Sequence, residues 1–175
     1  LMVPAHNEEV SIVPSVLSFL TLEYPNLEVI VVNDGSSDDT LGELMRAFDL
    51  YEVPPAFPVS IVTQPVRAYF RSRLHSRLLV LDKANGGKAD ALNAALNASR
   101  HAFVVAVDAD TLIEPDALMR LARPFLLGAN VAAVGGTIRV ANSCTVEFGR
   151  VTDARVDTRW LVGCQVVEYL RAFLF

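Results

Sequence analysis

Short, nearly continuous apolar runs alternate along the chain with stretches in which apolar residues recur every three or four positions. A continuous run is typical of a strand covered on both faces, whereas the longer spacing predicts a helix that packs by one side. The predicted strands cover residues 1–4, 27–32, 59–63, 78–81, 103–107 and 131–134. The predicted helices include residues 10–20, 41–48, 91–96, 115–125 and 151–175. This alternation indicates βαβ units and a parallel sheet with right-handed crossovers.

Two segments fit this alternation less simply. Residues 65–77 contain four arginines and no acid, which predicts a solvated basic loop or a helix beneath the sheet. Residues 151–175 keep apolar residues at helical spacing with charged residues between them, which predicts a long amphipathic helix. That helix either packs on parts of the protein outside this chain, which is the favoured alternative, or lies along a membrane surface.

Composition narrows the classes of protein to consider. A chain of 175 residues is long enough for one domain with a substantial core. Its net charge of −5 argues against a general nucleic-acid surface, and it has no run of eighteen apolar residues that would predict a transmembrane helix. The two cysteines have no metal-spaced partners and predict no disulfide framework. A strand pattern at the first residue and an apolar last turn indicate a piece of a longer polypeptide.

The strand predicted at residues 103–107 ends in two carboxylates, Asp108 and Asp110. Alternation along a strand would place both on the same side, at the carboxyl end where open parallel sheets bind ligands. One interpretation is a divalent-metal site for a phosphorylated ligand, since Mg²⁺ is held by carboxylates together with phosphate oxygens. The other is that the two aspartates solvate the strand end and cap the following helix. The spacing alone leaves both open.

Three more of the predicted strands end in or lead into polar loops, which would lie at the same edge of a parallel sheet. Asp34 can accept hydrogen bonds from a base or a ribose. Lys88, at the start of a helix, suits a diphosphate, and Gly86 and Gly87 let the backbone approach a ligand closely. A metal on Asp110 would complete the neutralisation. The loops concerned are residues 5–9, 33–40 and 82–88.

Four motifs, in this order, resemble those of the family 2 glycosyltransferases, which have the GT-A fold. They are VPAHNEE at residues 3–9, VVNDGSSD at 31–38, NGGKADALN at 85–93 and DAD at 108–110. The third motif, followed by QVVEY at 165–169, is most similar to the membrane-associated processive subgroup that makes poly-N-acetylglucosamine, chitin and hyaluronan. The resemblance implies an α/β fold with a Rossmann-like, mostly parallel sheet and helices on both faces.

The resemblance also implies a division of the chain and roles for individual residues. Residues 1–150 would form the nucleotide-sugar-binding core, and the helix at 151–175 would lead into an acceptor and catalytic-base part. Asp110 and Asp108 would bind Mg²⁺ or Mn²⁺, and Gly135 and Gly136 would border the acceptor side. The general base, a carboxylate in the family, is expected beyond Phe175. The donor nucleotide would be bound by Pro4, Ala5, Glu8, Asp34, Lys88 and Asp108.

The function implied is that of an inverting, metal-dependent glycosyltransferase. It would move a sugar, N-acetylglucosamine or a similar one, from a UDP-sugar to a growing glycan or a lipid-linked acceptor, with no nucleic-acid partner. The full-length protein would be associated with the cytoplasmic face of the plasma membrane, and this segment would be soluble. Two alternatives stay open: a nucleotide-binding fragment without independent activity, and a haloacid-dehalogenase-type phosphatase that uses Asp108 as nucleophile and Asp110 as acid/base.

Overall fold

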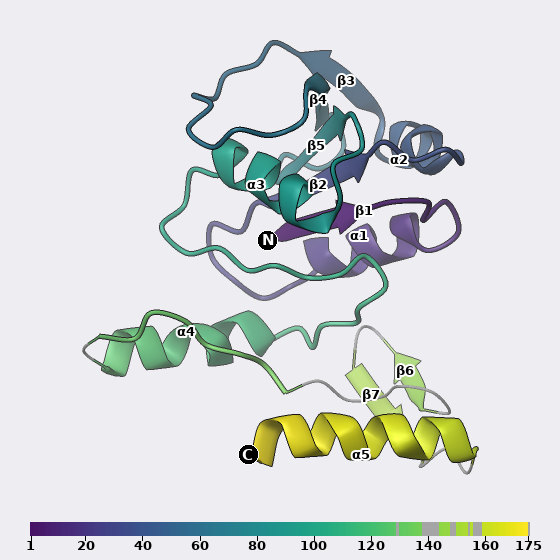
Figure 1. The fold of residues 1–175 in the computed structure, drawn as a ribbon, viewed down its shortest axis with the longest axis vertical. Coiled ribbons are helices and arrows are strands. Elements are labelled where there is room, and N and C mark those ends of the chain that lie inside the picture. Colours follow the sequence, from purple (N-terminus) through teal and green to yellow (C-terminus); the bar gives the residue numbers. More distant parts are fainter. Residues whose placement is uncertain (129, 138–143, 148–149, 154, 156–158, 175) are drawn as a thin grey trace. The chain divides into compact units, whose positions relative to one another are not determined.

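The computed structural model describes all residues except 129, 138–143, 148–149, 154, 156–158 and 175 (Figure 1). The chain forms two compact units. The first consists of residues 1–21 and 25–112, and the second of residues 22–24 and 113–175.

A five-stranded sheet in the order β1-β2-β5-β4-β3 forms the centre of the first unit (Figure 1). Three neighbouring strands are parallel: β1 (Met2–Ala5), β2 (Val29–Asp34) and β5 (Leu78–Lys83). The other two are antiparallel: β4 (Val66–Ser72) and β3 (Leu50–Val53). The mixed α/β fold, with a parallel arrangement near the core, is therefore confirmed.

Helices cover both faces of this sheet (Figure 1). Helix α3 (Lys88–Ala98) packs on β1 and β2, whereas α1 (Ile12–Leu20) and α2 (Thr40–Phe48) lie against the opposite face. Because α3 presents alanines to the sheet, its axis can approach the strands closely. The cluster beneath α3 is formed by Met2, Ile30, Val32, Leu79, Leu81, Ala91, Ala94, Ala95 and Ala98.

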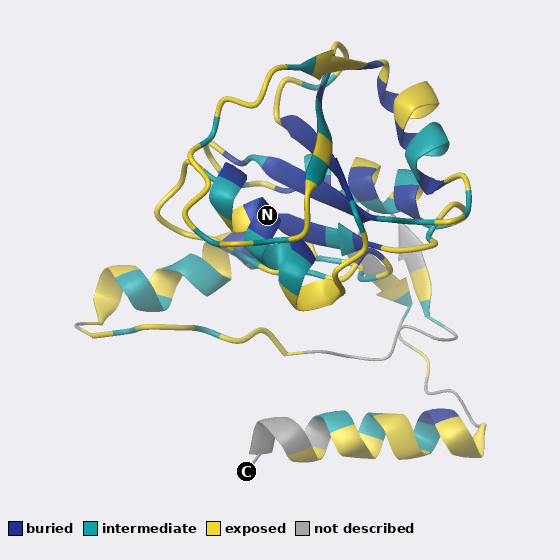
Figure 2. Ribbon diagram, turned by 45° about the horizontal axis from the view of Figure 1, so that its top comes forward, coloured by how far each residue is buried: buried dark blue, intermediate teal, exposed yellow. Residues whose placement is uncertain are grey.

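Burial explains why the sequence marks β2 and β5 so clearly. Every residue of both strands is buried, including the polar residues at their carboxyl ends (Figure 2). A central parallel strand covered on both faces needs apolar side chains at consecutive positions, not alternating ones. The predictions at residues 27–32 and 78–81 are confirmed for this reason.

The strand predicted at residues 103–107 is wrong as a regular strand. This segment runs beside β1 with a single parallel bridge, Met2 to Ala106. Hydrogen bonds join it to β1, from Met2 N–H to the Val105 carbonyl at 2.7 Å and from Val107 N–H to the Met2 carbonyl at 3.0 Å. Phe103 is exposed, so the apolar run does not enter the core over its full length.

Three other predictions are wrong. Residues 59–63 form no strand, since the N–H groups of Ser60 and Ile61 donate to Asn97 Oδ1 on α3 instead of to a neighbouring strand. Residues 131–134 have no regular structure. Residues 65–77, expected as a loop or a helix, supply β4 and pair with an unpredicted edge strand, β3.

The second unit contains helix α4 (Ala117–Leu127), the antiparallel pair β6 (Thr145–Glu147) and β7 (Arg150–Asp153), and helix α5 (Trp160–Leu174). The helix predicted at 115–125 is confirmed with shifted ends. The helix predicted at 151–175 begins at Trp160, and residues 151–153 belong to strand β7 instead. Residues 154, 156–158 and 175 of that range lie outside the described residues. Within the described part of the chain, no helix is long and apolar enough to cross a membrane.

Candidate functional site

The predicted site residues of the first unit gather at the carboxyl edge of the parallel strands. The loops after β1, β2 and β5 all begin at this edge. The bridge between Met2 and Ala106 is parallel, so the chain reaches Asp108 at the level of Pro4. Four segments that are far apart in the sequence thus meet at one edge, where open α/β sheets bind ligands.

Asp34 lies at the end of β2 and is only 3% exposed. Its Oδ1 accepts hydrogen bonds from Lys83 Nζ at 2.6 Å and from Gly86 N–H at 3.0 Å, and its Oδ2 accepts from Gly87 N–H at 2.7 Å. The Asp34 carbonyl accepts from Asn85 Nδ2 at 2.9 Å. The carboxylate predicted to contact a base or ribose is therefore bonded within the protein to the loop of residues 84–88, which we call the glycine loop.

The loop after β1 is hydrogen-bonded to the loop after β2 through the motif residues. Asn7 N–H donates to Ser36 Oγ at 3.0 Å, and Asn7 Oδ1 accepts from Ser37 N–H at 2.8 Å. Glu8 N–H donates to Thr40 Oγ1 at 2.8 Å. The bonds of Asn7 join the VPAHNEE motif to the VVNDGSSD motif, and that of Glu8 joins it to the first residue of α2, so these polar residues hold the shape of the site edge.

Asp38 also joins the loop after β1 to the start of α2. Partial desolvation acts to raise the pKa of its carboxyl, but hydrogen bonds from the Thr40 hydroxyl and from the backbone N–H groups of Glu9 and Thr40 outweigh it and lower the pKa. The charged carboxylate is thus the form that holds the start of α2, where an acidic group also interacts favourably with the helix dipole.

The remaining residues of the first loop differ in exposure. Ala5 is buried and Pro4 is half-buried at the end of β1. The half-buried Glu8 accepts a hydrogen bond from the Ser11 hydroxyl at the start of α1. His6, which had no assigned role, is exposed, and its Nδ1 lies 3.0 Å from the Asp34 carbonyl oxygen.

Lys88 and Asp108 form an exposed ion pair, with Lys88 Nζ 2.5 Å from Asp108 Oδ1. Asp110 is exposed in a turn closed by a hydrogen bond from Thr111 N–H to the Asp108 carbonyl at 3.1 Å. The carboxylates therefore lie on a turn and not on one side of a strand, which corrects the argument from strand alternation.

Two exposed carboxylates fit the donor set of Mg²⁺ or Mn²⁺ when a diphosphate supplies further oxygens. Among the described residues, no group of three or more His, Cys, Asp or Glu side chains could hold a metal by itself. The residues therefore fit an ion that binds together with the nucleotide better than a resident structural metal.

Gly135 and Gly136 are exposed and belong to the second unit. A side chain at Gly135 would meet no atom within 4 Å. Their place at the acceptor side stays a prediction.

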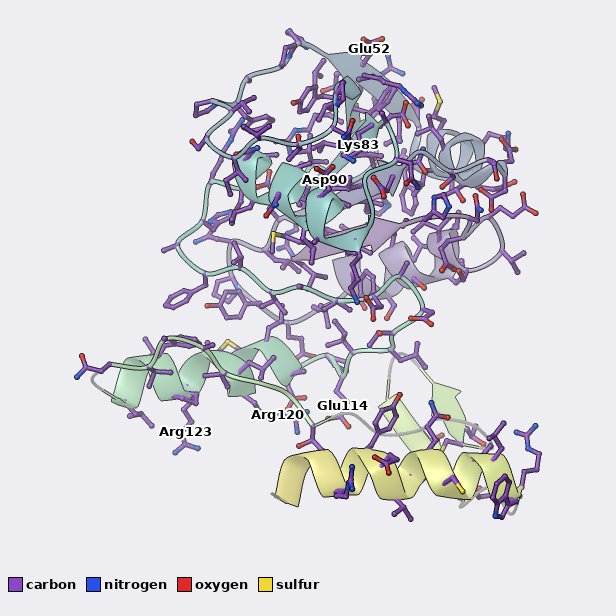
Figure 3. All side chains as sticks on the ribbon, in the orientation of Figure 1. Glu52, Lys83, Asp90, Glu114, Arg120 and Arg123 are labelled. Carbon is purple, nitrogen blue, oxygen red and sulfur yellow. The ribbon has the colours of Figure 1, made fainter. Side chains whose placement is uncertain are left out.

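Sequence reasoning missed the polar residues beneath the loops. Lys83 is fully buried and pairs with both Asp34 and Asp90. Figure 3 shows Lys83 close to Asp90. Beside them, Asn33 Nδ2 donates to Asp82 Oδ1 at 2.8 Å. A lysine or aspartate after an apolar strand reads as the start of a solvated loop. The only available signal for the pairing of Lys83 is the presence of an aspartate in each of two other motifs, Asp34 and Asp90.

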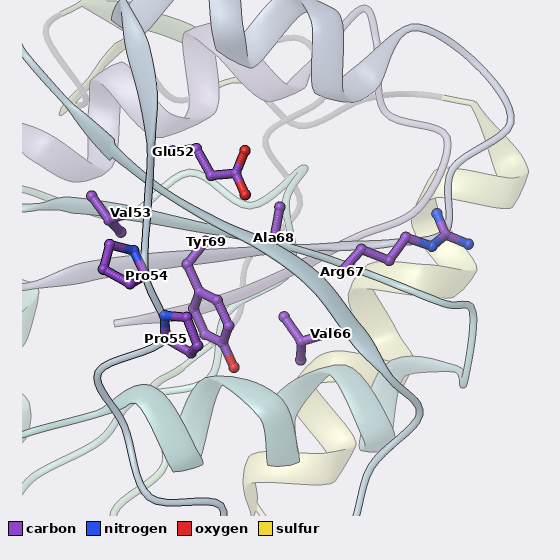
Figure 4. Close-up of a pocket in the computed structure, with 8 residues that line it drawn as sticks. All are labelled: Glu52, Val53, Pro54, Pro55, Val66, Arg67, Ala68 and Tyr69. Carbon is purple, nitrogen blue, oxygen red and sulfur yellow. The ribbon is translucent and has the colours of Figure 1, made fainter.

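A pocket of about 350 Å³ lies at the antiparallel side of the sheet (Figure 4). It contains none of the predicted site residues and is separate from the set described above. The residues that line it are Glu52, Val53, Pro54, Pro55, Val66, Arg67, Ala68 and Tyr69.

Comparison with known proteins gives the family. The sequence profile described as Glycosyltransferase like family 2 matches residues 1–171. A poly-β-1,6-N-acetyl-D-glucosamine synthase of Staphylococcus epidermidis is 28% identical over 163 residues, which are 93% of this chain and 33% of that protein. The synthase of Staphylococcus aureus strain COL is 26% identical over 164 residues, with the same coverage of 93% and 33%. The chain thus spans about a third of the length of these relatives.

A solved structure supports the fold. The crystal structure of residues 1–349 of Staphylococcus aureus TarS in complex with UDP-GlcNAc superposes with a TM-score of 0.52 at 24% identity, covering 78% of this chain and 36% of the crystallised chain. At this identity the likeness concerns the fold alone. The profile match over nearly the whole chain favours a glycosyltransferase over the phosphatase alternative. The chain belongs to glycosyltransferase family 2.

Proposed function

We propose that this chain is the donor-binding part of an inverting glycosyltransferase that takes its sugar from a UDP-sugar. The observation that carries the proposal is the convergence of polar loops at the carboxyl edge of β1, β2 and β5. There, the glycine loop positions Lys88 with its Nζ 2.5 Å from Asp108. Lys88 and Asp108 supply a cation and a carboxylate at the surface, and buried, hydrogen-bonded residues support the loop beneath them. This arrangement suits a ligand that carries both phosphates and a metal.

Different residues would act on different parts of the UDP-sugar. Pro4, Ala5 and Glu8 would line the nucleotide side, and Lys88 would neutralise charge on the diphosphate. Asp34 would act on the nucleotide mainly through the loop that it holds, since its carboxylate is already hydrogen-bonded to Lys83 and the glycine loop. Any contact of Asp34 with the base or ribose would therefore involve its backbone or a rearranged loop.

In the reaction, the oxygen of an acceptor hydroxyl forms a bond to C1 of the sugar while the bond from C1 to the diphosphate oxygen breaks. UDP leaves, and the hydroxyl proton passes to a carboxylate general base outside this chain, which acts from the face opposite the leaving group. Mg²⁺ or Mn²⁺ held by Asp108 and Asp110 would supply positive charge to the departing diphosphate. Because the base is expected beyond Phe175, the chain alone would bind the donor without catalysing transfer.

The sugar is proposed to be N-acetylglucosamine and the acceptor a growing glycan. Two relatives that match 93% of this chain are poly-β-1,6-N-acetyl-D-glucosamine synthases. Association of the full-length protein with the cytoplasmic face of the membrane is part of the same proposal and rests on the resemblance to the processive subgroup.

The test is the thermal stability of the chain with UDP, GDP and ADP, each with and without Mn²⁺. Ligand at a hundredfold excess over Kd adds about 2.7 kcal/mol to the stability of the folded state. We expect a shift specific to UDP, dependent on Mn²⁺ and lost in Asp110→Ala. A comparison of UDP-GlcNAc with UDP-glucose then tests the sugar. A folded chain that shows no UDP shift would argue against the donor site, unless a longer chain that continues past Phe175 restores it.

A further inference from the structure

The side chain of Lys83 has no solvent exposure, although it lies at the edge where the ligand is expected. Its ammonium group contacts three acceptors: Asp34 Oδ1 at 2.6 Å, Asp90 Oδ1 at 2.5 Å and the Ala84 carbonyl at 2.6 Å. Lysine has three donors and no acceptor, so its hydrogen-bonding capacity is fully used within the protein. Lys83 therefore cannot bind a ligand without first breaking one of these contacts.

The acceptors of Lys83 connect the parts of the donor edge. Asp34 ends β2 and, through both carboxylate oxygens, also accepts from the N–H groups of Gly86 and Gly87. Asp90 lies in the first turn of α3 and also accepts from Gln64 N–H at 3.0 Å, which joins the segment before β4. One buried cation thus fixes the ends of two strands, the glycine loop and the start of a helix.

The glycine loop has little room to adopt another shape. A Cβ at Gly86 would overlap the Asp90 carboxylate, and a Cβ at Gly35 would lie 2.6 Å from Asn85 N. Gly87 has φ of +84° immediately before Lys88, where α3 begins. The direction in which Lys88 leaves the loop is therefore set by the contacts of Asp34 and Asp90 with Lys83.

We infer that Lys83 is a positioning residue for donor binding, which acts through the glycine loop on Lys88 without touching the nucleotide. This inference rests on the proposed function of the edge as a UDP-sugar site. Loss of the Lys83 charge leaves the buried Asp34 carboxylate and the partly buried Asp90 carboxylate without the cation that they share, and the loop that Asp34 holds loses its fixed shape. Lys88 then reaches the diphosphate only in the fraction of molecules in which the loop is correctly formed. The other molecules bind the nucleotide as weakly as a chain without Lys88, which raises the apparent Kd.

The experiment measures the Kd for UDP with Mn²⁺ for the unsubstituted chain, Lys83→Met, Lys88→Ala and the double variant, at a temperature where each is folded. If the loop keeps its shape for about a tenth of the time in Lys83→Met, the Kd rises by up to about tenfold, and by no more than it rises in Lys88→Ala. Because Lys83 would act through Lys88, Lys88→Ala should weaken binding in the unsubstituted chain and add little in the Lys83→Met background. Amide exchange at Gly86 and Gly87 should become faster in Lys83→Met while that of Leu79 in β5 stays slow.

Leu44→Ala is the matched control, since Leu44 is fully buried on α2, away from the glycine loop. It should lower stability and leave the Kd for UDP unchanged. If Lys83→Met does not fold, Asp90→Asn weakens the same cluster and should raise the Kd in the same way. A Kd equal to that of the unsubstituted chain, or effects of Lys83→Met and Lys88→Ala that simply add, would overturn the inference alone. No UDP binding by the unsubstituted chain, with or without residues past Phe175, would overturn the proposed function as well.

Discussion

Asp34 ends β2 and Asp108 follows the segment that bridges the other side of β1, so both lie at the same edge of the sheet, but their charges have opposite surroundings. Asp34 is buried and accepts hydrogen bonds from Lys83 and from two backbone N–H groups. The side chain of Asp108 is 53% exposed and is paired with Lys88, whose side chain is 62% exposed. A buried charge that loses its partner is costly, whereas an exposed pair contributes little to stability. The first carboxylate therefore maintains the site, and the second is available to a ligand.

The largest effect that this comparison predicts is on folding. Asp34→Ala should lower the free energy of unfolding by about 3–5 kcal/mol, because it removes one partner of the buried Lys83 and the acceptor of the glycine loop. Denaturant unfolding monitored by circular dichroism measures it. Asp108→Ala is the control and should change stability by less than about 0.5 kcal/mol. Equal losses in the two variants would contradict the distinction between them.

A backbone substitution tests the same region without changing charge. Gly35 has φ of +64°, and a Cβ there would lie 2.6 Å from Asn85 N. Gly35→Ala should therefore cost about 1–3 kcal/mol, from strain and from displacement of the glycine loop. Gly163→Ala on α5, where a Cβ meets nothing within 4 Å, should be neutral or slightly stabilising. Unfolding curves of both variants give the comparison, and a Gly35→Ala chain as stable as Gly163→Ala would show that the loop can move freely.

The contact between Asp90 and Lys83 makes the free energy of unfolding depend on pH. The hydrogen bond from Lys83 lowers the pKa of Asp90. A lowered folded pKa means that the carboxylate adds stability above its ordinary value of about 3.9, and that this contribution is lost as the pH falls through the lower, folded value. Asp90→Asn should therefore cost about 1–2 kcal/mol near neutral pH and progressively less in acid. Unfolding measured from neutral pH downward tests this, and a cost that stays constant would be inconsistent with a charged Asp90.

The difference between buried and exposed positions also decides what the sequence could predict. β2 and β5 are buried along their whole length, so consecutive apolar residues marked them. β4 is not predicted, because the number of arginines in residues 65–77 indicates a loop or a helix. Within β4, Arg67 and Arg71 lie at alternate positions among less polar residues, and this period of two is typical of a strand. The run at 103–107 was read as a strand from its residues, but it forms only one bridge, because its first apolar residues remain exposed.

The candidate site shows the same limit. The motifs predicted which loops would carry polar residues, because loop residues adjacent in sequence stay adjacent in the fold. They could not predict that Asp34 faces inward to Lys83 and Asp108 outward to Lys88. Asp34 and Lys83 are 49 positions apart in the sequence, and Lys88 and Asp108 come from different loops. Direction relative to the core is a tertiary property, which a motif leaves open.

Lys88 combines a small expected effect on stability with the sharpest functional contrast. Its pair with Asp108 is exposed on both sides, so Lys88→Ala should change the free energy of unfolding by no more than about 1 kcal/mol, and less at high salt, where such pairs are screened. The same variant should weaken UDP binding, because a charge near the diphosphate is lost from a loop that keeps its shape. Calorimetric titration with UDP and Mn²⁺, beside an unfolding curve for the same preparation, separates the two effects. A variant that lost stability as Asp34→Ala does, while binding UDP normally, would assign Lys88 to the scaffold and leave the exposed half of the edge without its proposed role.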